Sequence, residues 1–133
     1  MIKYNDLLDV PFVDGGRDPE TGLDCWGLVM EVMSRFGNNV PDFGISCWDA
    51  ASIAAAYGRE KASGKWRKAD GPAPGLLVVM AFDPLHPGMV QHYGVCLDRR
   101  RFIHILDKTK VIVSKVAGDY FAKRIAGFYE WTG

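Results

Sequence analysis

Three residues of this chain, Cys25, His92 and His104, have side chains suited to hydrolysing an amide bond. A cysteine nucleophile needs an imidazole to take and return its proton, and the imidazole needs a third group to fix its tautomer. His92 and His104 are twelve positions apart. This even spacing predicts that they face each other across a hairpin centred on Asp98, with Cβ atoms about 4.5–5.5 Å apart. The pattern favours Cys25 as nucleophile, His92 as base and His104 as the residue that orients the base.

Cys25 falls at the first turn of a predicted helix. The apolar residues that follow it recur at helical spacing, which predicts a helix over 25–36 with Asp24 as its N-cap and Gly37 as its C-cap. A helix N-terminus offers unpaired N–H groups and partial positive charge, which stabilise a thiolate and can bind an oxyanion. A free cysteine taken alone is more often a small buried residue, so the interpretation depends on the histidines as well.

The elements that must position these residues follow from the rest of the pattern. Further helices are predicted over 3–9, 47–61 and 118–122. Strands are predicted over 76–82, 92–97, 101–106, 110–116 and 124–131, separated by loops over 10–24, 38–46, 62–75 and 83–88. Helices followed by antiparallel strands indicate an α+β fold, and the length suits a single domain over 1–133.

Composition excludes several classes of function. Lys+Arg and Asp+Glu are equal at 16 each, which gives no electrostatic footprint for nucleic acid or an anionic membrane. No apolar run is long enough for a signal peptide or membrane insertion, so we expect synthesis in the cytoplasm. The 3 cysteines form no C-x-x-C pair and no disulfide framework, and we expect no metal and no cofactor.

The other candidate residues favour structural roles. Cys47, at the start of the predicted second helix, and Cys96, inside a predicted strand, are interpreted as packing residues. His86 lies in a Pro-rich loop, where a functional role stays open. The tryptophans are interpreted as core or groove wall: Trp26, Trp48, Trp66 and Trp131.

Two segments carry a resemblance to a known family. GGRDPETGLDCWGLV resembles the nucleophile region of the NlpC-type cell-wall peptidases, and HYGVCLDRRRFIH resembles their second signature, a His-x-Gly strand followed twelve residues later by another polar residue. PGLLVVM stands in the place of their Pro-Gly-Asp-Leu-Val strand, with Leu76 instead of the aspartate. The resemblance runs from about residue 10 to residue 130. It implies a papain-like fold, with N-terminal helices on an antiparallel sheet, and supports the same three catalytic roles.

The resemblance also implies a substrate. Members of the family hydrolyse an amide bond in peptidoglycan stem peptides, commonly between D-glutamate and a diamino acid, without a cofactor. On this basis we expect Phe12, Asp24, Trp26 and Tyr93 to contact the peptide. Phe12 stands where many members carry a tyrosine, so a hydroxyl that would position the substrate or oxyanion is missing.

A finer resemblance points to a setting. The ending KVIVSKVAGDYFAKRIAGFYEW, the Pro-Phe of the approach loop and the tryptophan after the cysteine look like the phage and prophage tail-assembly members. This favours a phage tail-associated hydrolase that has tail proteins as partners and reaches the wall in the virion tail or by release. Three alternatives stay open: a structural tail component with little activity, a related thiol amidase or acyltransferase with the same triad, and a zinc site of Cys25, His92 and His104 without an evident fourth ligand.

Overall fold

The computed structural model describes residues 2–133, in which both α-helices precede the strands of the main sheet. A 3-10 turn, η1 (Asn5–Leu7), and a short hairpin of β1 (Arg17–Asp18) and β2 (Gly22–Leu23) precede two helices, α1 (Cys25–Arg35) and α2 (Ala50–Ala62). The remaining strands are β3 (Trp66–Ala69), β4 (Leu77–Met80), β5 (His92–Cys96), β6 (Arg101–His104), β7 (Ile112–Lys115) and β8 (Ile125–Trp131). The predicted α+β fold is confirmed.

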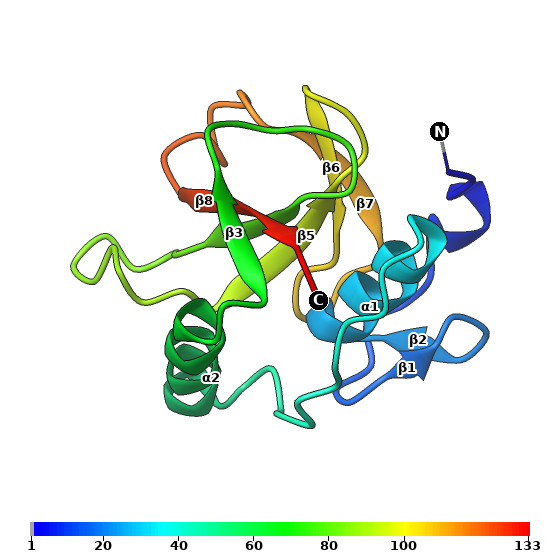
Figure 1. Ribbon diagram of the computed structural model, residues 1–133. Helices are drawn as coiled ribbons and strands as arrows, with labels where there is room; N and C mark the ends of the chain where they lie inside the picture. The colour runs from blue at the N-terminus through cyan, green and yellow to red at the C-terminus, as the bar shows by residue number, and fades with distance from the viewer. Residues whose placement is uncertain (1) are drawn as a thin grey trace.

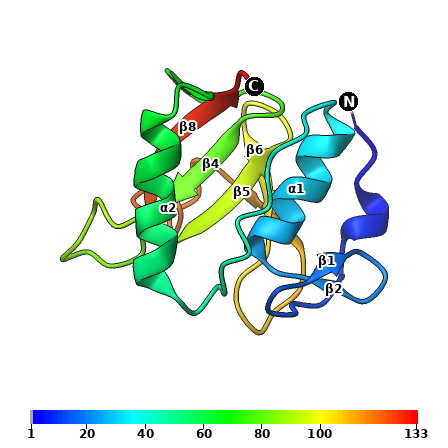
Figure 2. The same cartoon turned by 60° about the horizontal axis from the view of Figure 1, so that its bottom comes forward.

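Six of the strands form one antiparallel sheet in the order β3-β8-β4-β5-β6-β7 (Figure 1). Its centre, β4 and β5, is buried along its whole length. Both helices lie in front of the sheet in Figure 2, and the segment 38–49 runs between them. The main core fills the space between α1 and this face of the sheet, while a smaller apolar cluster covers the other face. The sheet thus holds β5 directly beneath the helix that begins at Cys25.

Local sequence explains why α1 begins and ends where it does. The Asp24 carboxylate accepts a hydrogen bond from the Gly27 N–H at 2.7 Å, as an N-cap does. At the other end Gly37 adopts a φ of 88°, and the Asn38 N–H donates to the Met33 carbonyl at 2.8 Å, closing a Schellman turn. The predicted helix and its N-cap are confirmed, while the C-cap is Phe36, one residue before the predicted Gly37.

Other predicted elements differ from the structure. The second helix begins at Ala50, capped by Asp49, so Cys47 lies in the irregular segment before it. Residues 118–122 form turns and no helix, and only one 3-10 turn forms within 3–9. The hairpin of β1 and β2 lies inside a predicted loop, and β3 lies inside another. β3 escaped prediction because it is a short edge strand with two exposed basic residues at its centre.

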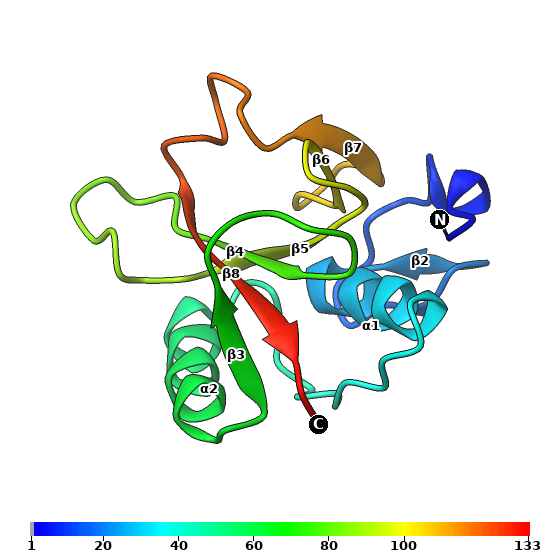
Figure 3. The same cartoon turned by 45° about the horizontal axis from the view of Figure 1, so that its top comes forward.

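The loop between β4 and β5 extends away from the body of the molecule (Figure 3). Its Leu85 side chain is 84% exposed. None of the helices in residues 2–133 combines the length and the apolar content that crossing a membrane requires.

Candidate active site

His92 and His104 are joined by a hydrogen bond in the middle of the sheet. His92 Nε2 lies 3.1 Å from His104 Nδ1. The predicted register is wrong, however, because Gly94 and not His92 lies directly opposite His104. The rings meet along the diagonal between β5 and β6, which side chains of this length can span. A Cβ on Gly94 would lie 3.1 Å from the His104 Cβ, so the glycine leaves the room in which His104 sits.

Aromatic side chains enclose the two rings and exclude water from them. Phe82 stacks on His92 with ring centres 5.3 Å apart, and Phe102 and Phe121 pack on His104 at 4.5 and 4.8 Å. Burial, followed by the proximity of His104, lowers the pKa of His92 to about 3, and burial lowers the pKa of His104 to about 4. Both rings are therefore neutral at neutral pH, as a general base must be before it accepts a proton.

Ser114 extends the pair into a chain of three groups. Its hydroxyl oxygen on β7 lies 2.8 Å from His104 Nε2. If Nε2 of His104 donates to Ser114, then Nδ1 of His104 accepts from Nε2 of His92, and Nδ1 of His92 remains free to accept a proton. In this arrangement His92 has the tautomer that a catalytic base requires.

Cys25 stands at the first turn of α1 and contacts β5 beside His92. A backbone hydrogen bond from Tyr93, the residue after His92, reaches its sulfur, and a second comes from Trp26. These bonds favour the thiolate, but burial and then the charge of Asp24 outweigh them and raise the pKa of Cys25 to about 12. The helix terminus alone predicts a lowered pKa, and this expectation is wrong for the closed pocket because the thiol is only 7% exposed. The Cys25 thiol is therefore neutral at neutral pH, and it lies next to β5, the strand that carries the neutral His92.

Asp24 is fixed from three sides. Besides the Gly27 N–H, its carboxylate accepts from the Gly15 N–H at 3.0 Å and from Arg17 Nη1 at 2.6 Å. The Asp24 residue is only 1% exposed. These bonds orient the first turn of α1, and with it Cys25.

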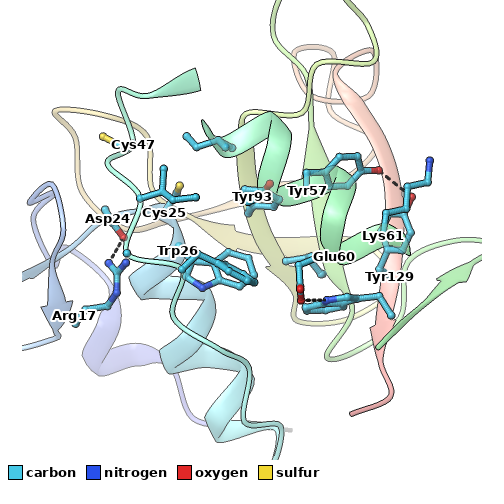
Figure 4. Close-up of a pocket in the computed structure, with 17 residues that line it drawn as sticks. Arg17, Asp24, Cys25, Trp26, Cys47, Tyr57, Glu60, Lys61, Tyr93 and Tyr129 are labelled. Atoms are coloured by element: carbon cyan, nitrogen blue, oxygen red, sulfur yellow. Dashed lines mark hydrogen bonds and ion pairs between the residues drawn. The ribbon is translucent and has the colours of Figure 1, made fainter. Parts of the chain in front are cut away.

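A pocket runs from Cys25 along α2 to the pair Tyr57 and Tyr129 (Figure 4). Trp26 and Tyr93 form its middle, with ring centres 5.2 Å apart, and the indole N–H of Trp26 donates to the Pro41 carbonyl at 2.8 Å. Segment 38–49 supplies one wall and α2 the opposite one. At the end away from Cys25, the hydroxyls of Tyr57 and Tyr129 lie 3.0 Å apart. The pocket is an apolar, aromatic channel with Cys25 at one end and the two tyrosine hydroxyls at the other.

Comparisons with known proteins agree with this geometry. The sequence profile described as "NlpC/P60 family" matches residues 9–130. The chain belongs to the NlpC/P60 family. It is 28% identical over 120 residues to the gamma-DL-glutamyl hydrolase of Bacillus subtilis (strain 168), covering 90% of this chain and 26% of that protein.

Two solved structures of NlpC/P60 proteins share the fold. One is a protein similar to a lipoprotein, from Staphylococcus aureus subsp. aureus Mu50, with a TM-score of 0.64 at 19% identity over 96% of this chain and 38% of that one. The other, from Bacillus cereus ATCC 10987, has a TM-score of 0.61 at 18% identity over 96% of this chain and 37% of that one. The chain thus spans about a quarter of the curated relative and less than two fifths of either solved structure. The NlpC/P60 family consists of cysteine peptidases and hydrolases of the cell-wall type.

The structure brings together some of the residues expected at the NlpC/P60 site. Asp24, Trp26 and Tyr93 line the pocket with Cys25, but Phe12, His92 and His104 do not. Phe12 is half-buried against the main core, and its N–H donates to the Thr109 carbonyl at 2.9 Å. At this position the chain therefore anchors the approach loop.

The remaining candidates divide between the pocket and the rest of the molecule. His86 is exposed and bonds Asp83 at 2.8 Å within its own loop, and Cys96 is fully buried in the cluster on the other face of the sheet. Cys47 lines the pocket, where its N–H donates to Asp14 at 3.0 Å. Within residues 2–133 no group of three or more His, Cys, Asp and Glu side chains could hold a metal ion.

Sequence reasoning missed several residues of the site. Arg17 lies inside the first signature segment but looks like an ordinary loop charge, while Ser114, Tyr57 and Tyr129 lie outside both segments. The even spacing of His104 and Ser114, which are ten positions apart across a predicted hairpin, was the one signal that pointed to any of them.

Proposed function

We propose that the chain is a cysteine endopeptidase that hydrolyses an amide bond in peptidoglycan stem peptides. The observation that carries the proposal is the series of hydrogen bonds from His92 to His104 at 3.1 Å and from His104 to Ser114 at 2.8 Å. The Cys25 thiol accepts a backbone hydrogen bond from Tyr93, the residue next to His92 on β5. Such a chain serves a base that accepts one proton at a defined nitrogen.

The steps follow from the protonation states. The Cys25 thiol gives its proton to neutral His92 as sulfur attacks the amide carbonyl, and backbone N–H groups at the start of α1 bind the oxyanion. His92 then protonates the leaving amine, and the acyl group remains on Cys25 as a thioester. Water that loses its proton to His92 hydrolyses the thioester and regenerates the thiol.

The bond we favour joins the γ-carboxyl of D-glutamate to a diamino acid. Family resemblance and the name of the B. subtilis relative, a gamma-DL-glutamyl hydrolase, support this choice. The aromatic channel beside Cys25 supports it further, because its far end offers hydroxyl groups to a polar substituent of the peptide.

Mass spectrometry of purified muropeptides tests the proposal. The wild type is expected to release one new pair of fragments whose combined mass exceeds that of the substrate by one water. Cys25→Ala is expected to release none. Cys96→Ala is the matched control, because that thiol lies in the apolar cluster on the other face of the sheet. Intact muropeptides with wild-type protein, under conditions in which Cys25 also resists alkylation, would refute the peptidase and favour a structural protein of the same fold.

We propose further that the enzyme acts with a phage tail. The motif Pro11-Phe12 in the approach loop, the tryptophan after Cys25 and the C-terminal sequence support this setting. In this setting the protein is made in the cytoplasm and reaches the wall in the virion or by lysis. Peptide mapping of purified virions from a host that carries the gene is expected to recover the chain with tail proteins, and its consistent absence from virions would contradict the tail assignment.

A further inference from the structure

Arg17 joins three segments of the chain at the side of the pocket. From β1, its Nη1 donates to Asp24 at 2.6 Å, while Nε and Nη2 donate to the two carboxylate oxygens of Asp42 at 3.0 Å each. Asp24 caps α1 next to Cys25, and Asp42 belongs to the 38–49 wall. One guanidinium therefore connects the nucleophile's helix to a wall of the pocket.

The position of Arg17 is built into the fold. A Cβ on Gly27 would lie 3.2 Å from Arg17 Nη1 and 2.0 Å from the Gly16 carbonyl oxygen. The same Nη1 also donates to that Gly16 carbonyl at 2.9 Å. The glycine in the first turn of α1 thus leaves the space that the approach loop and the guanidinium occupy together.

The charges around Cys25 show what the guanidinium does. Among the groups that influence the thiol, Asp24 is a buried anion that opposes the thiolate, and Arg17 is the cation that favours it. The other titratable groups near the thiol are neutral at neutral pH and come from β5 and segment 38–49: Tyr93 and Cys47. Without Arg17, Asp24 would present an uncompensated negative charge to the reacting sulfur.

We propose that Arg17 is a positioning residue for the reaction at Cys25, which cancels the charge of Asp24 beside the thiolate and holds the pocket wall through Asp42. The inference rests on the proposed thiol chemistry. The two tasks need different properties of the side chain. Cancelling the charge needs only a cation, whereas holding Asp42 and Asp24 at once needs the planar fork of arginine.

The rate of Cys25 alkylation by iodoacetamide, measured by peptide-mapping mass spectrometry at fixed pH values from about 7 to 10, tests the first task. Because these pH values lie below the pKa of about 12 of the Cys25 thiol, the rate is proportional to the thiolate fraction. Arg17→Gln is expected to raise the thiol pKa by about one unit, which makes alkylation about tenfold slower at each pH. Arg17→Lys is expected to keep the wild-type rate. Asp24→Asn, which retains an N-cap side chain, is expected to be alkylated faster than the wild type.

Kinetics with the muropeptide substrate test the second task. Arg17→Lys and Asp42→Asn are each expected to raise KM several-fold with little change in kcat, because both loosen the 38–49 wall while a cation stays next to Asp24. Arg17→Gln is expected to change KM and kcat together.

Arg35→Gln is the matched control, since Arg35 lies at the other end of α1 and pairs with Asp6 at 2.6 Å and Glu31 at 3.2 Å. It is expected to lower the melting temperature without changing the Cys25 alkylation rate. If Cys25 reacts at the same rate in wild type and Arg17→Gln, the inference alone is overturned. If Arg17→Gln does not fold, an unchanged alkylation rate in Asp24→Asn overturns the inference in its place. A Cys25 that resists alkylation throughout in the folded wild type would overturn the proposed function together with the inference.

Discussion

Replacing Gly94 by alanine is the sharpest test of how β5 and β6 hold the histidine pair. The added Cβ would lie 2.9 Å from the Ile103 carbonyl oxygen, 3.0 Å from Phe102 Cδ2 and 3.1 Å from the His104 Cβ. The Ile103 carbonyl oxygen and the His104 Cβ can move only together with the β6 backbone, so β5 and β6 must separate. Overpacking of this kind costs about 1–3 kcal/mol of unfolding free energy. In a chain of this length, that loss lowers the melting temperature by about 3–10 °C.

The same displacement should reach the chemistry, because it lengthens the 3.1 Å bond between His92 and His104. We expect kcat/KM to fall by about tenfold or more. Thermal melts by circular dichroism and muropeptide kinetics measure the two effects on one preparation. Gly58→Ala is the matched control: Gly58 lies in α2 with nothing within 4 Å of an added Cβ, so alanine should stabilise the helix by about 1 kcal/mol. A Gly94→Ala protein that melts and turns over like the wild type would refute the close approach of the two strands.

Three further predictions concern the same region. Ser114→Ala leaves the buried Nε2 of His104 without its hydrogen-bond partner, so we expect a loss of about 1–3 kcal/mol in melts and a fall in kcat with KM unchanged; a wild-type kcat would contradict the three-group chain. Gly27→Ala forces a Cβ to 2.0 Å from the Gly16 carbonyl oxygen, so we expect a melting temperature lower by about 10 °C or more, and a melt like the wild type's would exclude that contact. Burial lowers the pKa of His92 to about 3 and that of His104 to about 4, so below the ordinary value of about 6.5 the unfolded chain binds protons that the folded chain does not. As the pH is lowered from about 6.5 to 4, the unfolding free energy in urea should therefore fall. Each histidine contributes up to about 1.4 kcal/mol per pH unit to this fall. An unfolding free energy that does not change over this range would show that the rings are not buried as neutral groups.

The first turn of the catalytic helix could be predicted from sequence because its determinants are local. Asp24 caps the helix and Gly37 ends it through side-chain and backbone chemistry within a few residues. The spacing of His92 and His104 likewise placed the two rings near each other. The predicted register is wrong because the turn is built around the Asp98 carboxylate. This carboxylate accepts hydrogen bonds from the N–H groups of Arg100 and Arg101 at 2.8 Å each, which shifts the centre of the hairpin.

The rest of the site could not be predicted because it is assembled from segments that have no pattern in common. Arg17 looks like a solvated charge in a Gly-rich loop until Asp24 and Asp42 meet it. Burial also reverses the local expectation for Cys25, because the pocket that raises the pKa of its thiol is formed by α2 and segment 38–49. Sequence spacing reports neighbours along a helix or hairpin, and it does not report how deeply a group will be buried.

The indole of Trp26 gives the protein an internal optical probe. Its ring forms the middle of the channel, packs on Phe43 with centres 5.1 Å apart and donates to the Pro41 carbonyl. Anything that displaces the wall changes both the polarity and the quenching that this fluorophore experiences. Trp48, 63% exposed, emits from a different environment. Emission spectra can therefore follow occupation of the channel without a label, and before any bond is cut.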